Sequence, residues 1–227
     1  FTGDLTVDTS TLKVDSTNNR VGVGTASPSD PLHVTASSGS RMARFEASQA
    51  NSFIGFKDSN TNVMPTIGCT TDALELKTAS SGDPALGLKI DSSGRVTKPL
   101  QPAFYLNGTS FDSSTDKYLG GNSLQLLNIG SHMNTSTGVF TAPIAGRYIF
   151  IFTLVTNDTQ SHFIDILKND NTRYGHNLGY GVVYQTHSMQ VIAELAANDA
   201  ISAQRRGSAY GVYNAHFMGC IFSTKLV

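Results

Sequence analysis

Tryptophan is absent from the 227 residues, cysteine occurs only twice, and charged residues make up only 15%. Two cysteines, Cys69 and Cys220, are too few for a disulfide framework, and we expect both to be unpaired. The net charge of −1 provides no basic surface for nucleic acid or for acidic membranes. The sequence also lacks an apolar run long enough to span a bilayer. We therefore expect no nucleic-acid partner and no membrane insertion.

Residues 1–100 contain short apolar pairs separated by Ser, Thr, Asn, Asp and Gly. The two members of a pair are two positions apart, so both side chains lie on one face of a strand. Such thin stripes cannot close the core of one chain, but three chains around one axis could share them. We interpret this half as a trimeric β stalk, and the alternative is a disordered Ser/Thr-rich linker. The pairs are Leu5/Val7, Leu12/Val14, Val21/Val23, Leu32/Val34, Leu74/Leu76 and Leu88/Ile90.

An internal repeat supports ordered structure in this half. Residues 12–21 (LKVDSTNNRV) recur in a shorter form as residues 88–96 (LKIDSSGRV). Both copies have the pattern of a strand, a polar turn and a strand, which predicts two hairpins. Residues 40–50 favour a short helix by composition, because Ala, Met, Arg, Glu and Gln are good helix formers.

The composition changes after residues 98–102 (KPLQP), which are typical of an extended connector. Beyond them aromatic residues become frequent, and short apolar runs between turn residues predict a β-sandwich. The run Tyr148–Val155 is apolar at nearly every position, which indicates a strand covered on both faces. We therefore predict that Tyr148, Phe150 and Phe152 lie in a trimer interface. The alternative is a central strand buried within one large subunit.

Residues 138–150 (GVFTAPIAGRYIF) resemble the signature of the globular head of complement one-q. Three later segments fit the same family in the same order, namely His162–Lys168, Met189–Asp199 and His216–Phe222. In the second of these segments Ala197 and Asn198 replace the family's glycine. The resemblance covers about residues 102–227. It implies the trimeric jelly roll that this family shares with tumour necrosis factor.

Residues 20–28 (RVGVGTASP) resemble a "GIGTTSP" segment in fibre proteins of tailed bacteriophages, especially those of marine bacteria and cyanobacteria. The strands and the hairpin that follow it there have counterparts at Ile54–Asp58, Leu74–Thr78 and Ile90–Val96. This resemblance covers most of residues 1–98 and implies a virion appendage. Because residue 1 is Phe rather than Met, we expect a further N-terminal segment that attaches the chain to other virion proteins.

No pattern of catalytic residues stands out, and we expect neither enzyme activity nor a cofactor. Gly22 and Gly24 are not followed by the third glycine of a dinucleotide site. His162 and Asp165 are three apart, so a strand would point them to opposite faces. We also expect no metal site. One alternative stays open, in which His176 or His187 from three chains holds an ion on the threefold axis.

These features predict an all-β protein with a trimeric β stalk of short strands and hairpins (1–98) and a jelly-roll head (99–227). We expect a homotrimeric bacteriophage tail fibre, made in the host cytoplasm and external on the virion. Its head would display a receptor-binding surface to a glycan or protein of the host cell. The alternatives are a capsid-attached head fibre or decoration protein, and a polysaccharide-degrading tailspike.

The receptor-binding surface is expected at the end of the head farthest from the stalk. If the strands alternate from Pro102 and the closing strand returns to the base, the connections 179–186 and 205–214 lie at this far end. Tyr and Arg commonly anchor recognition surfaces, and paired arginines can hold a carboxylate or phosphate. The alternative is that the tyrosines pack the trimer apex while the arginines are solvated. The predicted residues are Tyr180, Tyr184, Arg205, Arg206, Tyr210 and Tyr213.

Overall fold

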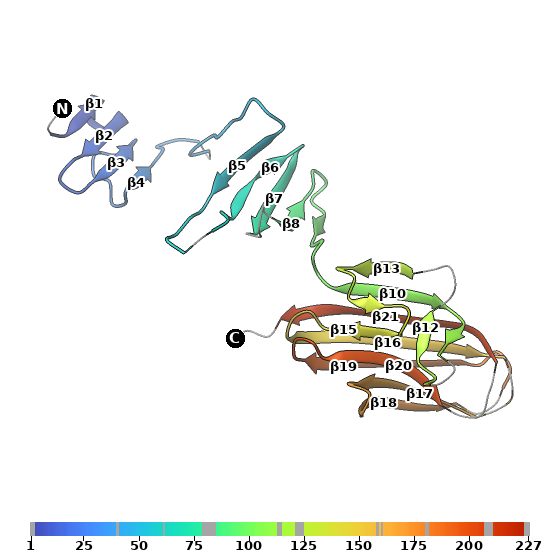
Figure 1. Cartoon of the computed structure of the whole chain (residues 1–227). Coiled ribbons are helices and arrows are strands. Elements are labelled where there is room, and N and C mark those ends of the chain that lie inside the picture. Colours follow the sequence, from blue (N-terminus) through green and yellow to red (C-terminus); the bar gives the residue numbers. More distant parts are fainter. Residues whose placement is uncertain are drawn as a thin grey trace.

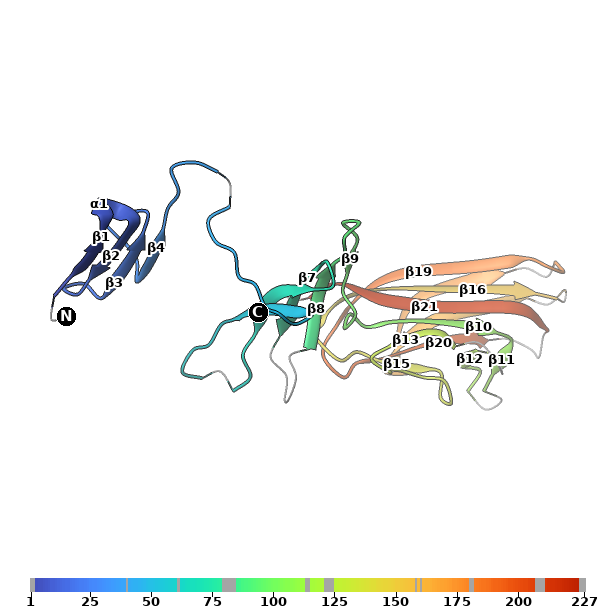
Figure 2. The same cartoon turned by 90° about the horizontal axis from the view of Figure 1, so that it is seen from above.

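The computed structural model of the chain describes residues 3–39, 41–60, 62–78, 85–112, 115–120, 125–157, 159, 161–179, 182–206 and 211–224. Its strands form two small sheets followed by a larger sandwich, and the three units follow one another along the chain (Figure 1). The view from above shows the same succession (Figure 2). The predicted all-β class is confirmed, since α1 (Asp8–Thr11) is a single helical turn. Within the described ranges, no helix has the length and apolar character needed to cross a membrane.

The first unit is a four-stranded sheet whose strand order follows the sequence. Its first three strands are antiparallel, and the fourth pairs with the third in parallel. The hairpin predicted at residues 12–21 is confirmed, and its turn is held by Asp15 Oδ1, which accepts a hydrogen bond from Asn18 N at 3.0 Å. The strands are β1 (Leu5–Val7), β2 (Leu12–Asp15), β3 (Arg20–Val23) and β4 (Leu32–Val34).

The second unit is a five-stranded antiparallel sheet, again in sequence order. Its last two strands confirm the second predicted hairpin. The shorter turn depends on Gly94, whose φ of 79° is in the left-handed region, and on Asp91 Oδ1, which accepts from Arg95 N at 3.0 Å. The strands are β5 (Asn51–Gly55), β6 (Thr66–Thr70), β7 (Ala73–Thr78), β8 (Ala85–Ile90) and β9 (Val96–Thr97).

The helix predicted for residues 40–50 is wrong. Residues 41–50 have no regular secondary structure, and all ten are exposed. Helix propensity contributes only tenths of a kilocalorie per residue, and most helices in proteins depend on packing an apolar stripe. This segment has no such stripe, so its composition alone does not make it helical.

The head, which begins at β10, is a sandwich of two antiparallel five-stranded sheets. One sheet has the order β13-β10-β21-β16-β19 and the other β14-β15-β20-β17-β18, while β11 and β12 form a small separate pair. The strands are β10 (Ala103–Gly108), β11 (Ser110–Phe111), β12 (Tyr118–Gly120), β13 (Gln125–Ile129), β14 (Met133–Asn134), β15 (Val139–Thr141), β16 (Gly146–Thr156), β17 (His162–Lys168), β18 (Thr172–Gly179), β19 (Thr186–Leu195), β20 (Ala200–Arg206) and β21 (Val212–Thr224).

The two ends of the head are defined by the pairing of its longest strands. At the base, where the chain enters, Ile221 N donates to Pro102 O at 3.2 Å, and Gly146 is paired with Thr224. At the far end, Thr156 is paired with Val212. The closing strand β21 therefore returns to the base, as the alternation of strands predicts. The eleven residues of β16 separate the two ends by about 33 Å at the rise of a strand.

The core between the two sheets is built from aromatic rings. Phe104 lies 5.1 Å from Phe140 and 4.9 Å from Phe217, measured between ring centroids. Tyr148, Phe150 and Phe152 belong to this same core and are fully buried within the single chain. Their assignment to a trimer interface is therefore corrected, because no second copy can reach side chains that the chain itself covers. The opposite face of β16 carries Ile149 and Ile151 instead.

Candidate functional site

The first candidate surface is the side of the β13-β10-β21-β16-β19 sheet that faces away from the core. Residues paired directly across antiparallel strands share a face, so the register defines rows across the sheet. We call the two rows that contain Ile149 and Ile151 the outer apolar face; a row with Arg147 and Glu194 lies between it and the base. One row contains Ile192, Ile149, Cys220, Ala103 and Ile129, and the next contains Gln190, Ile151, Met218, Tyr105 and Leu127.

The outer apolar face is hollowed by a cavity of about 620 Å³, whose lining includes Ile149, Ile151 and Met218. Toward the far end the rows become polar. There His216 Nδ1 lies 2.7 Å from the Tyr105 hydroxyl, and Thr153 and Ser188 share a hydrogen bond of 3.1 Å. The surface can therefore bury apolar area near the base, while the far half offers hydrogen-bonding groups.

The second candidate surface is an aromatic pair at the far end of the head. Tyr184 and Tyr213 meet edge to face, with ring centroids 5.3 Å apart, although 65% and 63% of their surfaces remain exposed. Tyr184 has a φ of 65°, which is unusual for a bulky residue, and its N–H donates to Thr156 O at 2.8 Å. Val182 beside it is 61% exposed. The structure thus holds an apolar and hydrogen-bonding surface open to solvent at the end opposite to the base.

The two predicted arginines also lie toward the far end, on the other sheet, but they are already paired. They are the last residues of the strand β20 rather than part of a loop. Arg206 Nε lies 2.5 Å from the carboxylate of Asp165, which is fully buried. Arg205 Nε lies 3.3 Å from Asp116 Oδ1, and its guanidinium stacks 4.4 Å from the centroid of the Phe111 ring. Both arginines are therefore paired with carboxylates of the head itself, and Asp165 is shared with Arg173, whose Nε lies 3.3 Å from the same oxygen.

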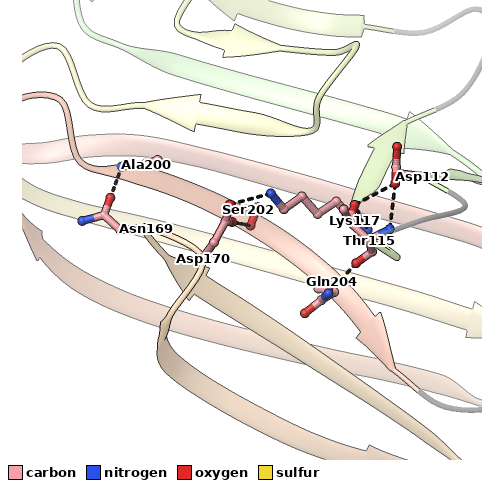
Figure 3. A network of polar contacts seen from close by, with 8 residues as sticks. All are labelled: Asp112, Thr115, Lys117, Asn169, Asp170, Ala200, Ser202 and Gln204. Carbon is pink, nitrogen blue, oxygen red and sulfur yellow. Dashed lines mark hydrogen bonds and ion pairs between the residues drawn. The ribbon is translucent and has the colours of Figure 1, made fainter.

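A polar network next to these arginines also has a structural role (Figure 3). Lys117 Nζ lies 2.8 Å from Asp170 Oδ2, and Thr115 N donates to Asp112 Oδ1 at 2.7 Å. The Gln204 side chain donates to Thr115 O. These contacts fasten the segment before β12 to the strand β20 and to the turn after β17. The network therefore ties segments that are distant in sequence to one another.

The remaining predicted residues divide into two groups. Tyr180 and Tyr210 lie outside the described residues, as does the side chain of His176. His187 is 5% exposed and points toward the interior of the head, which does not suit an ion on an external axis. Among the described residues, no three His, Cys, Asp or Glu side chains are grouped as metal ligands would be.

Sequence reasoning missed the residues of the outer apolar face. The alternation of Ile149 and Ile151 with aromatic residues along β16 is the signal that could have identified them, because large rings fill cores and smaller aliphatic residues are common at interfaces between sheets. Both sets of residues are apolar, however, so the pattern by itself does not tell which face is the inner one.

The head has the architecture of a known class, because its two facing antiparallel sheets form the jelly-roll sandwich shared by complement C1q and tumour necrosis factor domains. Residues 103–227 match the family model of the C1q domain. Since this match covers more than half of the sequence, the chain belongs to the C1q domain family. The resemblance to the complement one-q head is thereby confirmed, whereas the resemblance of residues 1–98 to bacteriophage fibre proteins stays a prediction.

Solved structures with a similar fold include the globular domain of zebrafish complement 1qA, with a TM-score of 0.45 and 14% identity over 55% of this chain and 99% of that one. Murine APRIL gives a TM-score of 0.42 and 10% identity over 52% and 98% of the two chains. Rabbit GITRL gives a TM-score of 0.33 and 15% identity over 39% of this chain and 74% of that one. No curated protein sequence matches the chain significantly. The family assignment rests on the domain match alone.

Proposed function

We propose that the chain is a homotrimeric fibre protein of a tailed-bacteriophage virion, in which the C1q head attaches to the host cell surface and has no enzymatic role. C1q domains are typically non-enzymatic ligand-binding or structural domains, and their homologues are homotrimers. The outer apolar face supports self-association, because contiguous apolar surface of this kind is characteristic of interfaces. Its cavity and its exposed Ile192 and Leu127, 63% and 42% exposed, are covered when copies pack together.

The observation that carries the attachment role is the exposed Tyr184–Tyr213 pair at the far end of the head. Tyrosine rings bury large areas at low entropic cost, and their hydroxyls can still form hydrogen bonds with a glycan or a protein. A fibre presents to the host the end that is farthest from its attachment to the virion. The pair lies at the end opposite to Pro102, where the stalk joins the head.

The virion assignment rests on the stalk. Its hairpin at residues 88–96 and its strand β7 coincide with the hairpin and one of the strands of the fibre-like sequence pattern, which supports this assignment. Short sheets joined in series suit a spacer that holds a head away from a particle. The chain would be an external appendage of the virion, made in the host cytoplasm and attached to other virion proteins.

The proposal is tested first by the mass of the full-length chain in solution. Light scattering at micromolar concentration should give three times the mass of one chain, and a stable folded monomer would contradict the proposal. The variant Ile151→Glu places a charge in the outer apolar face and should weaken the trimer. The matched variant Thr186→Glu, on the same outer side of the sheet but at its far end, should leave the mass unchanged.

Attachment is tested by the binding of fluorescently labelled protein to cells of the bacterium that the phage infects. Tyr184→Ala combined with Tyr213→Ala should lower binding at least about tenfold, because aromatic anchors dominate the affinity of recognition surfaces. Phe222→Ala is the matched control, since Phe222 is also an exposed aromatic residue but lies near the base. If the double variant remains trimeric and binds as well as the unmodified protein, the far-end surface is not the attachment site.

A further inference from the structure

The second stalk unit has its polar and apolar faces in an unusual arrangement. The register of β5–β9 puts Ile54, Ile67, Leu76 and Leu88 in one row, and Ser52, Cys69, Leu74, Ile90 and Val96 in the next, all on one side of the sheet. We call these two rows the apolar stalk face. Ile54, Leu74, Leu76 and Val96 are 41%, 42%, 40% and 55% exposed. The side of the sheet that is apolar therefore faces solvent in the single chain.

The opposite side of the same sheet combines charged residues with Phe53 and Ala73, and it is largely covered. Glu75 is only 4% exposed, and its carboxylate lies 3.4 Å from Lys77 Nζ and 3.5 Å from Lys89 Nζ. Thr70 donates a third contact at 3.0 Å, and Lys77 lies 4.2 Å from the centroid of the Phe53 ring. Burial alone would raise the pKa of Glu75, but these donors hold the pKa below its ordinary value of 4.5. The side chains on this side of the sheet therefore cover one another within the single chain.

The first unit likewise has its apolar residues on one side of the sheet. Its register places all the apolar pairs predicted there on one side, with Leu5, Val14, Val21 and Leu32 in one row and Val7, Leu12, Val23 and Val34 in the other. Val7 and Leu32 are 48% and 64% exposed. A small sheet is not stable in water unless its apolar side is packed against something. In the described residues no second sheet or long helix covers either unit (Figures 1 and 2).

We propose that the apolar stalk face packs against the same face of other copies of this chain, so that the stalk acquires its core only on assembly. The proposal rests on the proposed homotrimer and names the residues through which its stalk associates. The rows themselves contain no charged side chain, and Asp72 is the one charged residue in the lining of the cavity over them. The open cavity of about 520 Å³ over this face, lined by Phe45, Ile54, Ile67 and Leu74 among others, marks the space that a partner's side chains would fill.

The head supplies the proximity that the stalk needs. Only residues 98–102 separate β9 from β10, and a connector of this length spans at most about 20 Å. Three heads joined by their outer apolar faces therefore keep three stalk sheets close together. A short tether of this kind gives an effective concentration in the millimolar range, so even a weak contact between sheets is formed.

Cys69 lies within the apolar stalk face and is exposed in the single chain, which makes it a reporter of this contact. The full-length protein would be treated with a maleimide, and labelling of Cys69 and Cys220 would be followed separately by peptide mass spectrometry. Cys69 should react at least about tenfold more slowly in the native protein than in urea, because packing against a second copy excludes the reagent. Leu74→Glu should restore fast labelling, whereas Met42→Glu should not, since Met42 is equally exposed, at 48%, but lies outside the face.

The outcomes separate this inference from the proposed function. A trimer in which Cys69 reacts as fast as in urea would overturn the stalk contact and leave the trimeric head standing. A monomeric full-length chain with a reactive Cys69 would overturn both. If Ile151→Glu produces monomers whose Cys69 stays protected, Cys69 is covered by its own chain. The proposed contact between copies would then be wrong. Protection that is lost together with the trimer supports the proposal.

Discussion

At the scale of single residues, Asp199 shows how a side chain holds a turn at the base of the head. Its Oδ2 accepts from Ala196 N at 2.7 Å and lies 2.6 Å from Lys168 Nζ, while Oδ1 accepts from the Asn169 amide at 2.9 Å. Asn169 in turn accepts from Ala200 N at 2.8 Å (Figure 3). Asp199 therefore links the turn between β19 and β20 to the turn between β17 and β18. Burial alone would raise the pKa of Asp199, but the donors around it lower the pKa below its ordinary value of 3.8.

This environment predicts a loss of stability in acid. Because the pKa of Asp199 is depressed in the folded chain, its contribution is present above the ordinary value and is lost as the pH falls toward the folded value. Asp199→Ala should lower the free energy of unfolding by about 1–3 kcal/mol near neutral pH, since Lys168 and Ala196 N lose a partner. In urea unfolding measured at about pH 6 and about pH 3, the variant should also depend less on pH.

The control is Asp170→Ala. Asp170 is also paired with a lysine, but its side chain is 61% exposed, and such surface pairs contribute at most about 1 kcal/mol. This variant should keep the acid dependence of the unmodified protein. An Asp199→Ala protein with unchanged acid dependence would mean that other carboxylates control the acid response of the head.

At the scale of elements, the presence of strands was easier to predict than the direction in which their side chains face. The stalk strands follow from apolar residues two apart, because only a two-residue period places such pairs on one face. In β16 both faces are apolar, so this two-residue period is absent from the sequence. The pattern therefore does not distinguish the aromatic face, which lies in the core, from the outer face with Ile149 and Ile151. The sequence predicts a loop at Arg205 and Arg206, because the outer face of a strand can be as polar as a loop. Their partners Asp116 and Asp165 are distant in sequence, so no local pattern reveals the pairing.

The strand β21 provides a test of the aromatic packing. Gly219 lies against the core, and a Cβ built there would be 2.5 Å from Phe150 Cδ1 and 2.8 Å from Phe104 Cε1. Gly219→Ala should therefore lower the free energy of unfolding by about 1–3 kcal/mol, because rings packed on all sides cannot move away. A Cβ at Gly175 would be 2.5 Å from Met189 Sδ, which is part of a flexible side chain. Gly175→Ala should therefore lower the free energy of unfolding by less than Gly219→Ala. If urea unfolding gives equal losses of stability for the two variants, the aromatic rings can rearrange.

At the scale of the whole molecule, the two halves differ in how they obtain a core. Prolines aside, Ala73 is the one buried aliphatic or aromatic side chain in the described ranges that precedes Ala103, and all the others belong to the head. The two sheets of residues 1–98 instead expose their apolar rows in the single chain. The match to the family model covers residues 103–227, which is the half of the chain that contains its own core. The sequence of residues 1–98 predicts the strands but not what covers their apolar rows, because an apolar pair has the same pattern whether it packs within one chain or against another.

This difference predicts how the halves behave when they are produced separately. A fragment of residues 99–227 should fold, because it contains the whole aromatic core, and its thermal unfolding by circular dichroism should be cooperative. A fragment of residues 1–98 should lack a cooperative transition at micromolar concentration, because its apolar rows are not buried and its sheets are too small to offset the conformational entropy of the chain.

Fusing this fragment to an unrelated trimeric protein through the 98–102 connector should restore a cooperative transition if proximity is what the head supplies. A well-ordered monomer of residues 1–98, with dispersed amide signals in its NMR spectrum, would show that the stalk does not depend on assembly.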